Sequence, residues 1–160
     1  MANLIVAGAA GRMGRVLIGM IARDPVHKLA GAVEAKGVAA VGSDAGEVAG
    51  VGPLGVRITD DYAALARPDT VTLDFTNAAA SLEHLNLAAN HGAAIVVAST
   101  GFNADQEKRA VAIAPRTRTV IAPNLSIGVN VLSKIVEQVA AIVRPRASAV
   151  PLGASTLVRW

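Results

Sequence analysis

The sequence contains no cysteine, which excludes disulfides and thiolate metal sites. Aromatic residues make up only 2% of the 160 residues, although 52% are hydrophobic. A core must therefore be built from Ala, Val, Leu and Ile, which is typical of the buried strands of a parallel sheet. The length is sufficient for one domain with a substantial core.

Long hydrophobic runs are also missing. None approaches the roughly 18 residues of a membrane-spanning helix. The N-terminus lacks the basic and hydrophobic regions of a secretion signal. We therefore expect a cytoplasmic protein with no membrane partner.

Acidic residues are absent from residues 144–160. All 12 lie in residues 1–143 with 12 of the 15 basic residues, so Arg144, Arg146 and Arg159 account for the net charge of +3. A nucleic-acid surface needs basic side chains clustered on one face with stacking aromatics. Neither feature is visible, and we expect no nucleic-acid partner.

Histidines are few and isolated. His27 falls in a turn, and His84 and His91 are expected on the outer side of a helix. None has a nearby carboxylate or second histidine at metal-ligand spacing, and no nucleophile–base pair is recognisable. We expect no metal site and no catalytic residue in this chain.

Three glycines follow the first hydrophobic run, and a segment with helical spacing follows them. Gly8 allows a sharp turn, Gly11 leaves room for a phosphate, and Gly14 lets the helix lie close to the strand. The first amides of the helix then face an anion. This G-x-x-G-x-x-G pattern indicates a dinucleotide loop; the alternative is a strand–helix turn without a ligand.

Glu34 ends the second hydrophobic run, about 20 residues beyond Gly14. A carboxylate at this spacing is placed to accept hydrogen bonds from ribose hydroxyls; alternatively, it is a solvated acid at a strand end. Its charge disfavours a 2′-phosphate, whereas Lys36 and Arg12 offset that charge. NADH and NADPH both remain open.

Hydrophobic runs and helical patterns alternate along the chain. The glycine-rich segment 36–55 is expected to be a surface loop. Right-handed crossovers then give an α/β fold with a Rossmann-like, doubly wound parallel sheet in the order 3-2-1-4-5-6. We expect strands at 3–7, 28–34, 56–58, 70–75, 94–98 and 119–122, and helices at 11–23, 60–67, 78–90, 104–114 and 128–143.

Ligands of such sheets bind at the carboxyl ends of the strands. Asp74 lies at such an end, where it either holds its own loop in place or takes part in the binding site. Ser99 and Thr100 offer hydroxyls near a nicotinamide ring, or act as loop caps, and Asn124 and Ser126 have the same two interpretations. We expect one crevice to be formed by the loops 8–14, 34–36, 74–77, 98–101 and 122–126.

Several motifs occur together in order. They are Gly8–Gly14, Gly42–Glu47, Asp74–Thr76, Ser99–Phe102 and Asn124–Asn130. Over residues 3–143 the chain resembles the cofactor domain of bacterial 4-hydroxy-tetrahydrodipicolinate reductase (dihydrodipicolinate reductase), a family of the diaminopimelate route to lysine.

The resemblance implies hydride transfer from NADH or NADPH to a cyclic, dicarboxylated imine-type substrate. It implies diphosphate contacts in the first glycine loop, a ribose contact at Glu34 beside Lys36, and nicotinamide contacts in two later loops. The residues implied are Gly8, Ala9, Ala10, Gly11, Arg12 and Met13 for the diphosphate, and Ala98, Ser99, Thr100, Ala122, Pro123, Asn124 and Leu125 for the nicotinamide.

Three positions depart from the family pattern. Ala98–Gly101 reads Ala-Ser-Thr-Gly where the family usually has Gly-Thr-Thr-Gly, and Pro123–Leu125 reads Pro-Asn-Leu where it often has Ala-Asn-Phe. Ala35 stands where an arginine often follows the ribose acid, which weakens the case for tight NADPH binding unless Lys36 substitutes.

A larger departure follows residue 143. The family continues with a His-His-x-x-x-Lys segment and a substrate domain that also builds a homotetramer, whereas residues 144–160 form an atypical basic tail. We expect residues 1–143 to form a dinucleotide-binding domain without a substrate domain, as the truncated or frame-shifted product of such a gene. We expect this product to be inactive alone. It should be a monomer or an aggregating species, because the edge of its sheet is uncovered. The alternatives are an inactive remnant, a free-standing nucleotide-binding module, another Rossmann dehydrogenase, or a CoA-binding domain.

Overall fold

The computed structural model describes residues 2–143 and 157–158. Its centre is a sheet in the order β3-β2-β1-β4-β5-β6-β7, and the first six strands in the sequence are parallel. The expected Rossmann-like fold and strand order are confirmed. The parallel strands are β1 (Asn3–Ala7), β2 (Lys28–Val33), β3 (Ile58–Thr59), β4 (Thr70–Asp74), β5 (Ala94–Val97) and β6 (Thr119–Ile121).

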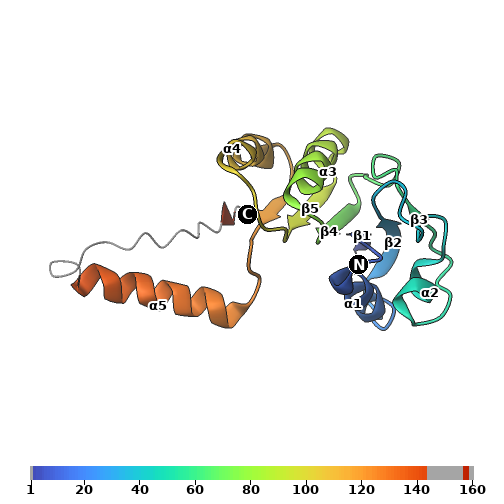
Figure 1. Cartoon of the computed structure of the whole chain (residues 1–160), viewed down its shortest axis with the longest axis horizontal. Coiled ribbons are helices and arrows are strands. Elements are labelled where there is room, and N and C mark those ends of the chain that lie inside the picture. Colours follow the sequence, from blue (N-terminus) through green and yellow to red (C-terminus); the bar gives the residue numbers. More distant parts are fainter. Residues whose placement is uncertain (1, 144–156, 159–160) are drawn as a thin grey trace.

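Helices cover the two faces of the sheet. On one face lie α3 (Ala78–His91) and α4 (Ala104–Ile113), and on the other lie α1 (Arg12–Ile21) and α2 (Ala45–Ala49) (Figure 1). Successive residues of a strand point to opposite faces. Accordingly Ile5 belongs to the core beneath α3 and α4, and Val6 belongs to the core beneath α1 and α2.

Side-chain caps fix where two helices begin. The Asn77 side chain accepts hydrogen bonds from the amides of Ala79 and Ala80 at the start of α3. Asn103 and Gln106 form a reciprocal capping box at the start of α4. A 3₁₀ turn, η1 (Ala114–Arg116), follows α4 where Pro115 prevents continuation.

The expectation of a surface loop over residues 36–55 is wrong in part. The Asp44 carboxylate accepts hydrogen bonds from four backbone amides, those of Gly46, Glu47, Leu54 and Gly55, at 2.8–3.2 Å. These bonds cap α2 and draw the chain back over it. One carboxylate therefore orders a segment whose glycine content indicates a loop.

The helix expected over residues 60–67 is absent from the structure, which has only turns there. The Asp61 carboxylate accepts from the Ala64 amide, and one turn forms without propagating. Tyr62 is instead buried in the core beneath α3. Burial of this ring anchors the segment to the sheet.

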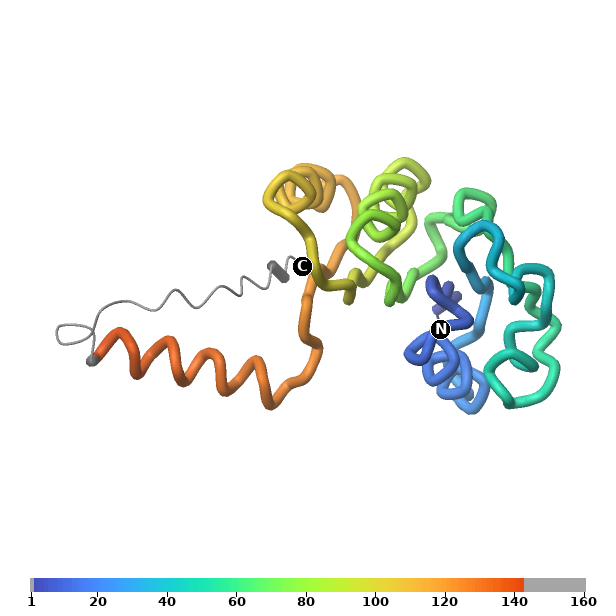
Figure 2. The backbone as a smooth tube through the Cα atoms, viewed as in Figure 1, coloured from blue at the N-terminus to red at the C-terminus, as the bar shows by residue number. Residues whose placement is uncertain are grey.

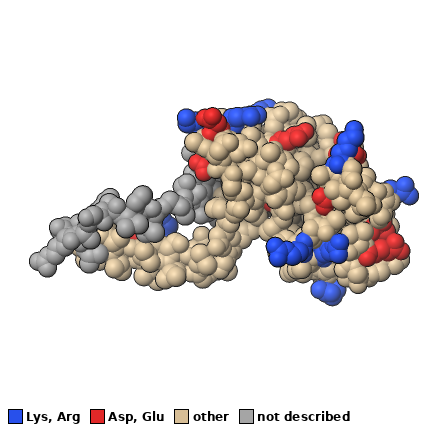
Figure 3. All heavy atoms as spheres, in the orientation of Figure 1, with Lys and Arg blue, Asp and Glu red and all other residues tan. Residues whose placement is uncertain are grey.

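The last helix, α5 (Ile127–Val143), extends away from the sheet (Figures 1 and 2). Its hydrophobic side chains are exposed along its length. Ile127 at its start is 82% exposed, and Ile142 near its end is 78% exposed. In Figure 3 charged side chains are spread over the sheet and its covering helices, but are sparse on the visible face of α5. No helix in the described ranges is long and apolar enough to span a membrane.

The strand β7 (Leu157–Val158) pairs antiparallel with β6. The edge that was expected to be uncovered is thus paired at Val120 and Ile121. The remainder of the basic tail, residues 144–156 and 159–160, lies outside the described residues.

Candidate functional site

The turn between β1 and α1 requires glycine at two positions. Gly8 has φ +79°, a left-handed conformation that side chains disfavour. A Cβ on Gly14 would lie 2.1 Å from the Gly8 carbonyl oxygen, so the close approach of α1 to the turn excludes any side chain there. The predicted roles of these two glycines therefore match the geometry.

The start of α1 leaves backbone amides without a side-chain cap. The helix begins at Arg12, and its N-cap residue Gly11 has no side chain to accept from the first turn. The first amides of a helix lack intrahelical partners, and the helix dipole is positive at this end. Arg12 and Met13 are also exposed, so the end of α1 is open to an anion.

Glu34 lies directly beside this turn. Its Oε2 accepts a hydrogen bond from the Ala10 amide at 2.9 Å, and its Oε1 accepts from the Ala35 amide at 3.0 Å. The carboxylate is thus held against the glycine loop rather than extended into solvent. This geometry is compatible with the ribose contact predicted for Glu34.

A cleft of about 600 Å³ joins these groups to the carboxyl end of β4. Its volume falls in the range of small-molecule sites. Of the five loops expected to form one crevice, those at 8–14, 34–36 and 74–77 line this cleft. The lining includes Gly8, Gly11, Glu34, Lys36, Tyr62, Thr76, Asn77 and His84.

The loops after β5 and β6 do not line this cleft. After β5, Ala98 is half-buried, Ser99 is buried and Thr100 is exposed. After β6, Ala122 is buried, whereas residues 123–125 (Pro123, Asn124 and Leu125) are exposed. The Asn124 side chain accepts from the Ser126 amide at 2.8 Å, which stabilises a local turn.

The position of His84 contradicts two expectations from the sequence, that it lies on the outer side of its helix and that it has no carboxylate nearby. Its ring faces inward from α3, its side chain is only 13% exposed, and its Nδ1 lies 2.8 Å from Asp74 Oδ2. The ring also packs against Tyr62, with 4.6 Å between centroids and a tilt of 43° between the ring planes. His27 likewise has a carboxylate partner, because its Nδ1 lies 2.8 Å from Asp24 Oδ2.

Asp74 is fully buried. Burial by itself raises its pKa, but hydrogen bonds from His84 and Thr76 outweigh this effect and hold the pKa of Asp74 below its ordinary value. The sequence left this residue between a structural and a site role. In the structure it stabilises the wall of the cleft through Thr76 and His84, which themselves line it.

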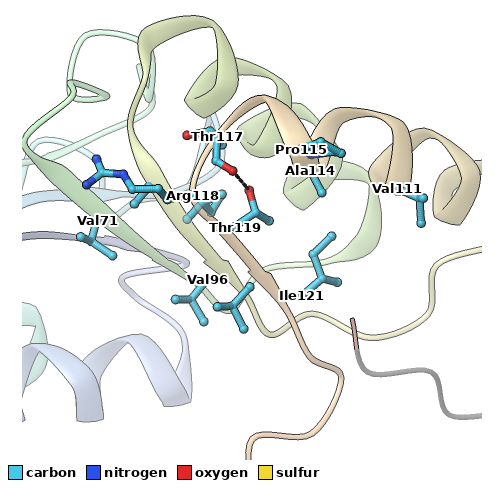
Figure 4. Close-up of a pocket in the computed structure, with 12 residues that line it drawn as sticks. Val71, Val96, Val111, Ala114, Pro115, Thr117, Arg118, Thr119 and Ile121 are labelled. Carbon is cyan, nitrogen blue, oxygen red and sulfur yellow. Dashed lines mark hydrogen bonds between the residues drawn. The ribbon is translucent and has the colours of Figure 1, made fainter. Parts of the chain in front are cut away.

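A second hollow of about 710 Å³ has a different character. It lies along β4, β5 and β6 near their amino ends and beside the end of α4 (Figure 4). Its walls are mainly hydrophobic, with Val71, Val96 and Val120 among them, and Arg118 is the only ionisable residue in the lining. It contains none of the predicted site residues. Within residues 2–143 and 157–158, no three His, Asp or Glu side chains gather as metal ligands.

Comparison with known proteins matches residues 2–125 to the family described as dihydrodipicolinate reductase, N-terminus. The chain is 44% identical over 142 residues to a 4-hydroxy-tetrahydrodipicolinate reductase of Anaeromyxobacter sp. (strain Fw109-5), covering 89% of this chain and 52% of the relative. It is 48% identical over 141 residues to the enzyme of that name from Rhizobium meliloti, covering 88% and 58%.

Solved structures share the fold. A dipicolinate-bound dihydrodipicolinate reductase from Paenisporosarcina sp. TG-14 matches with a TM-score of 0.68 at 21% identity, covering 88% of this chain and 54% of that one. An amine dehydrogenase from Mycobacterium smegmatis matches with a TM-score of 0.59 at 23% identity, covering 75% and 38%.

The chain spans about half the length of the curated relatives it matches. The matched region includes the glycine turn, Glu34 and the whole of the described cleft. These matches favour the resemblance seen in the motifs over a free-standing nucleotide-binding module. The chain belongs to the dihydrodipicolinate reductase family and corresponds to its N-terminal domain.

Proposed function

We propose that this chain binds a nicotinamide dinucleotide, NADH or NADPH, as the cofactor domain of a 4-hydroxy-tetrahydrodipicolinate reductase. The observation that carries the proposal is the placement of the Glu34 carboxylate against the Ala10 amide, at the rim of the cleft that the glycine turn lines. This arrangement supports the proposal, because dinucleotide-binding turns pair a diphosphate at the helix start with an acidic residue at the end of the second strand that accepts from the ribose.

We assign three parts of the cofactor to four loops at the carboxyl edge of the sheet. Residues 8–13 hold the diphosphate through the amides of Arg12 and Met13 at the start of α1, because the amides of residues 8–11 already donate to Val33, Gly8 and Glu34. Glu34 accepts from the adenosine ribose. The loops 98–100 and 122–125 contact the nicotinamide end. Support comes from their shared position after β1, β2, β5 and β6, where ligands of doubly wound sheets bind.

The choice between NADH and NADPH depends on a few side chains. Glu34 repels a 2′-phosphate, and Ala35 provides no positive charge. Lys36 lines the cleft next to them and provides the compensating charge. We therefore propose that both cofactors bind, with NADPH dependent on Lys36.

When bound, the cofactor would supply a hydride to a cyclic dicarboxylate substrate in lysine biosynthesis. The groups of this chain serve only to bind and orient it. We propose that residues 1–143 form this cytoplasmic cofactor domain and that this domain alone does not reduce substrate. Its partners would be the cofactor and, through the exposed α5, other copies in nonspecific association rather than a defined tetramer.

A cofactor titration tests the proposal. Thermal unfolding is measured with NADH, NADPH and CoA, and ligand at 100 times Kd should raise the free energy of unfolding by about 2.7 kcal/mol. We expect stabilisation by the two nicotinamide cofactors and none by CoA. The opposite preference would identify a CoA-binding domain. Oxidation of NADPH in the presence of substrate would contradict inactivity of the isolated chain.

A further inference from the structure

Asp74 is connected to the loop after β5 through buried hydroxyl groups. The Ser81 Oγ, on α3, lies 2.9 Å from Asp74 Oδ1 and 2.7 Å from Ser99 Oγ. Asp74 and Ser81 are 0% exposed and Ser99 is 6% exposed. Three segments far apart in the sequence are therefore joined by one short chain of hydrogen bonds.

The carboxylate determines the direction of these bonds. An ionised carboxylate can only accept, and a serine hydroxyl has one proton to donate. Ser81 is therefore the donor to Asp74 and, by geometry, also to Ser99, and its single proton is shared between these two contacts. The Thr76 amide and hydroxyl also donate to Asp74 Oδ1, at 3.0 and 2.6 Å, and His84 Nδ1 donates to Oδ2 at 2.8 Å. Each donor thus has a defined orientation.

Asp74 itself is not part of the cleft lining, whereas Thr76 and His84 are. At the far end of the chain, Ser99 belongs to the loop assigned to the nicotinamide. We propose that Asp74 is a positioning residue that, through Ser81, holds Ser99 and its loop in place for the nicotinamide half of the cofactor, an inference that rests on the proposed function. Asp74 touches no part of the ligand in this arrangement.

A substitution of Ser81 separates positioning from general stability. Ser81→Ala breaks the connection but leaves the glycine turn and Glu34 intact. It also removes the 3.1 Å contact of Ser81 Oγ with Thr76 Oγ1, while both bonds from Thr76 to Asp74 remain. The affinities for NADH and for ADP-ribose, which lacks the nicotinamide, are measured by calorimetry on the whole chain. We expect NADH to bind about 5- to 10-fold more weakly, the effect of one hydrogen bond, and ADP-ribose to bind within twofold of the unsubstituted protein.

Thr72→Val is the matched control. Thr72 is 0% exposed on the same strand, and its hydroxyl bonds to the Tyr62 hydroxyl at 2.8 Å, outside the chain from Asp74 to Ser99. This variant should lower the melting temperature without changing the ratio of the two affinities. The inference would be overturned if Ser81→Ala weakened the binding of both ligands equally, or weakened neither. It would also be overturned if Thr72→Val changed the ratio of the two affinities as much as Ser81→Ala does.

Amide hydrogen exchange over residues 99–101 tests positioning without a cofactor. We expect exchange to accelerate about tenfold in Ser81→Ala and to stay unchanged in Thr72→Val. If Ser81→Ala does not fold, Ser99→Ala breaks the same chain at its other end and should give the same affinity ratio. In the double variant the losses should not add, because both substitutions remove one connection.

The two proposals fail in different ways. If the unsubstituted chain binds neither NADH nor ADP-ribose, the proposed function is wrong, but the exchange rates still show whether Ser81 orders the loop. If it binds both and exchange over residues 99–101 is the same in Ser81→Ala, only the positioning role is wrong.

Discussion

Hydrophobic side chains are buried in the body of the protein, which comprises the sheet and helices α1 to α4, but they are exposed on α5. Ile5, Ile18 and Ile95 in the body are at most 1% exposed, whereas Leu132, Ile135 and Val139 on α5 are 50–59% exposed. The sequences of the two regions are similarly rich in Val, Leu and Ile. Composition alone therefore does not decide burial; the difference lies in whether the fold supplies a second surface.

The body has such surfaces because the crossovers place helices on both faces of β1. Two separate cores result, one on each side of the sheet. Within the described residues α5 extends away from the sheet (Figures 1 and 2). Its apolar side chains are exposed there. We infer that the stability of the body is independent of α5, and four variants test this comparison.

The largest effect is expected at Gly14. A Cβ there would lie 2.1 Å from the Gly8 carbonyl and 2.8 Å from Ala9 Cα, both backbone atoms that cannot move without displacing the turn. Gly14→Ala should cost about 3 kcal/mol of unfolding free energy, measured by urea denaturation. Gly19→Ala is the control, because its Cβ would meet Val51 Cγ1 at an ordinary 3.5 Å and alanine favours a helix. Equal stabilities of the two variants would contradict this packing.

The next effect is expected at Asp74. Asp74→Asn removes the charge that accepts from Thr76, Ser81 and His84 in a buried site, and should cost about 2–3 kcal/mol. Asp69→Asn is the control, because Asp69 is exposed and its loss should cost less than about 0.5 kcal/mol. Chemical denaturation of both variants provides the comparison.

The lowered pKa of Asp74 also predicts acid sensitivity. A group whose folded pKa lies below its ordinary value of 3.8 contributes stability that is complete above that value and is lost as pH falls through the lower folded pKa. Between pH 7 and pH 5 Asp74 should therefore contribute no slope, and below pH 4 stability should fall. Asp74→Asn should flatten the acid limb of the unfolding free energy, and an unchanged limb would contradict the assignment.

Local signals allowed the fold and the glycine loop to be predicted. The strands follow hydrophobic runs, and the turn is specified by Gly8 and Gly14 within one segment of sequence. Asn103 similarly marks the start of α4 because its capping partner is only three residues away. In each case the interacting groups are neighbours in the sequence, so their spacing carries the information.

The Asp74 connection could not be found in this way. Its partners Ser81, His84 and Ser99 come from α3 and the loop after β5, and only the packing of these elements brings them together. Alanine and leucine occur on several sides of α3, so the helical pattern did not show that His84 faces inward. Asp44 caps α2 through amides two and three residues away, but the glycine content of the segment favoured a loop; its bonds to amides ten and eleven residues away could not be found from spacing.

A smaller effect, confined to binding, is expected at Glu34. Glu34→Gln keeps an acceptor for the Ala10 amide but removes the charge offered to a ribose. NADH should bind about 10-fold more weakly, while stability changes little. Glu47→Gln provides the control, because this exposed carboxylate on α2 lies outside the cleft lining. Calorimetric titration that finds equal affinities for the two variants would rule out the ribose contact.

The smallest effect on stability is expected for substitutions on α5, and this result tests most directly whether the stability of the body is independent of α5. Leu132→Gln combined with Val139→Thr replaces two side chains that are 59% and 52% exposed. The unfolding free energy of the body should change by less than about 0.5 kcal/mol, whereas Leu85→Ala, at a position 1% exposed, should cost about 2–5 kcal/mol. Sedimentation should show less self-association in the α5 variant, because an exposed apolar helix face is the surface most prone to nonspecific contact. A large loss of stability in that variant would instead show that α5 packs against the body in solution.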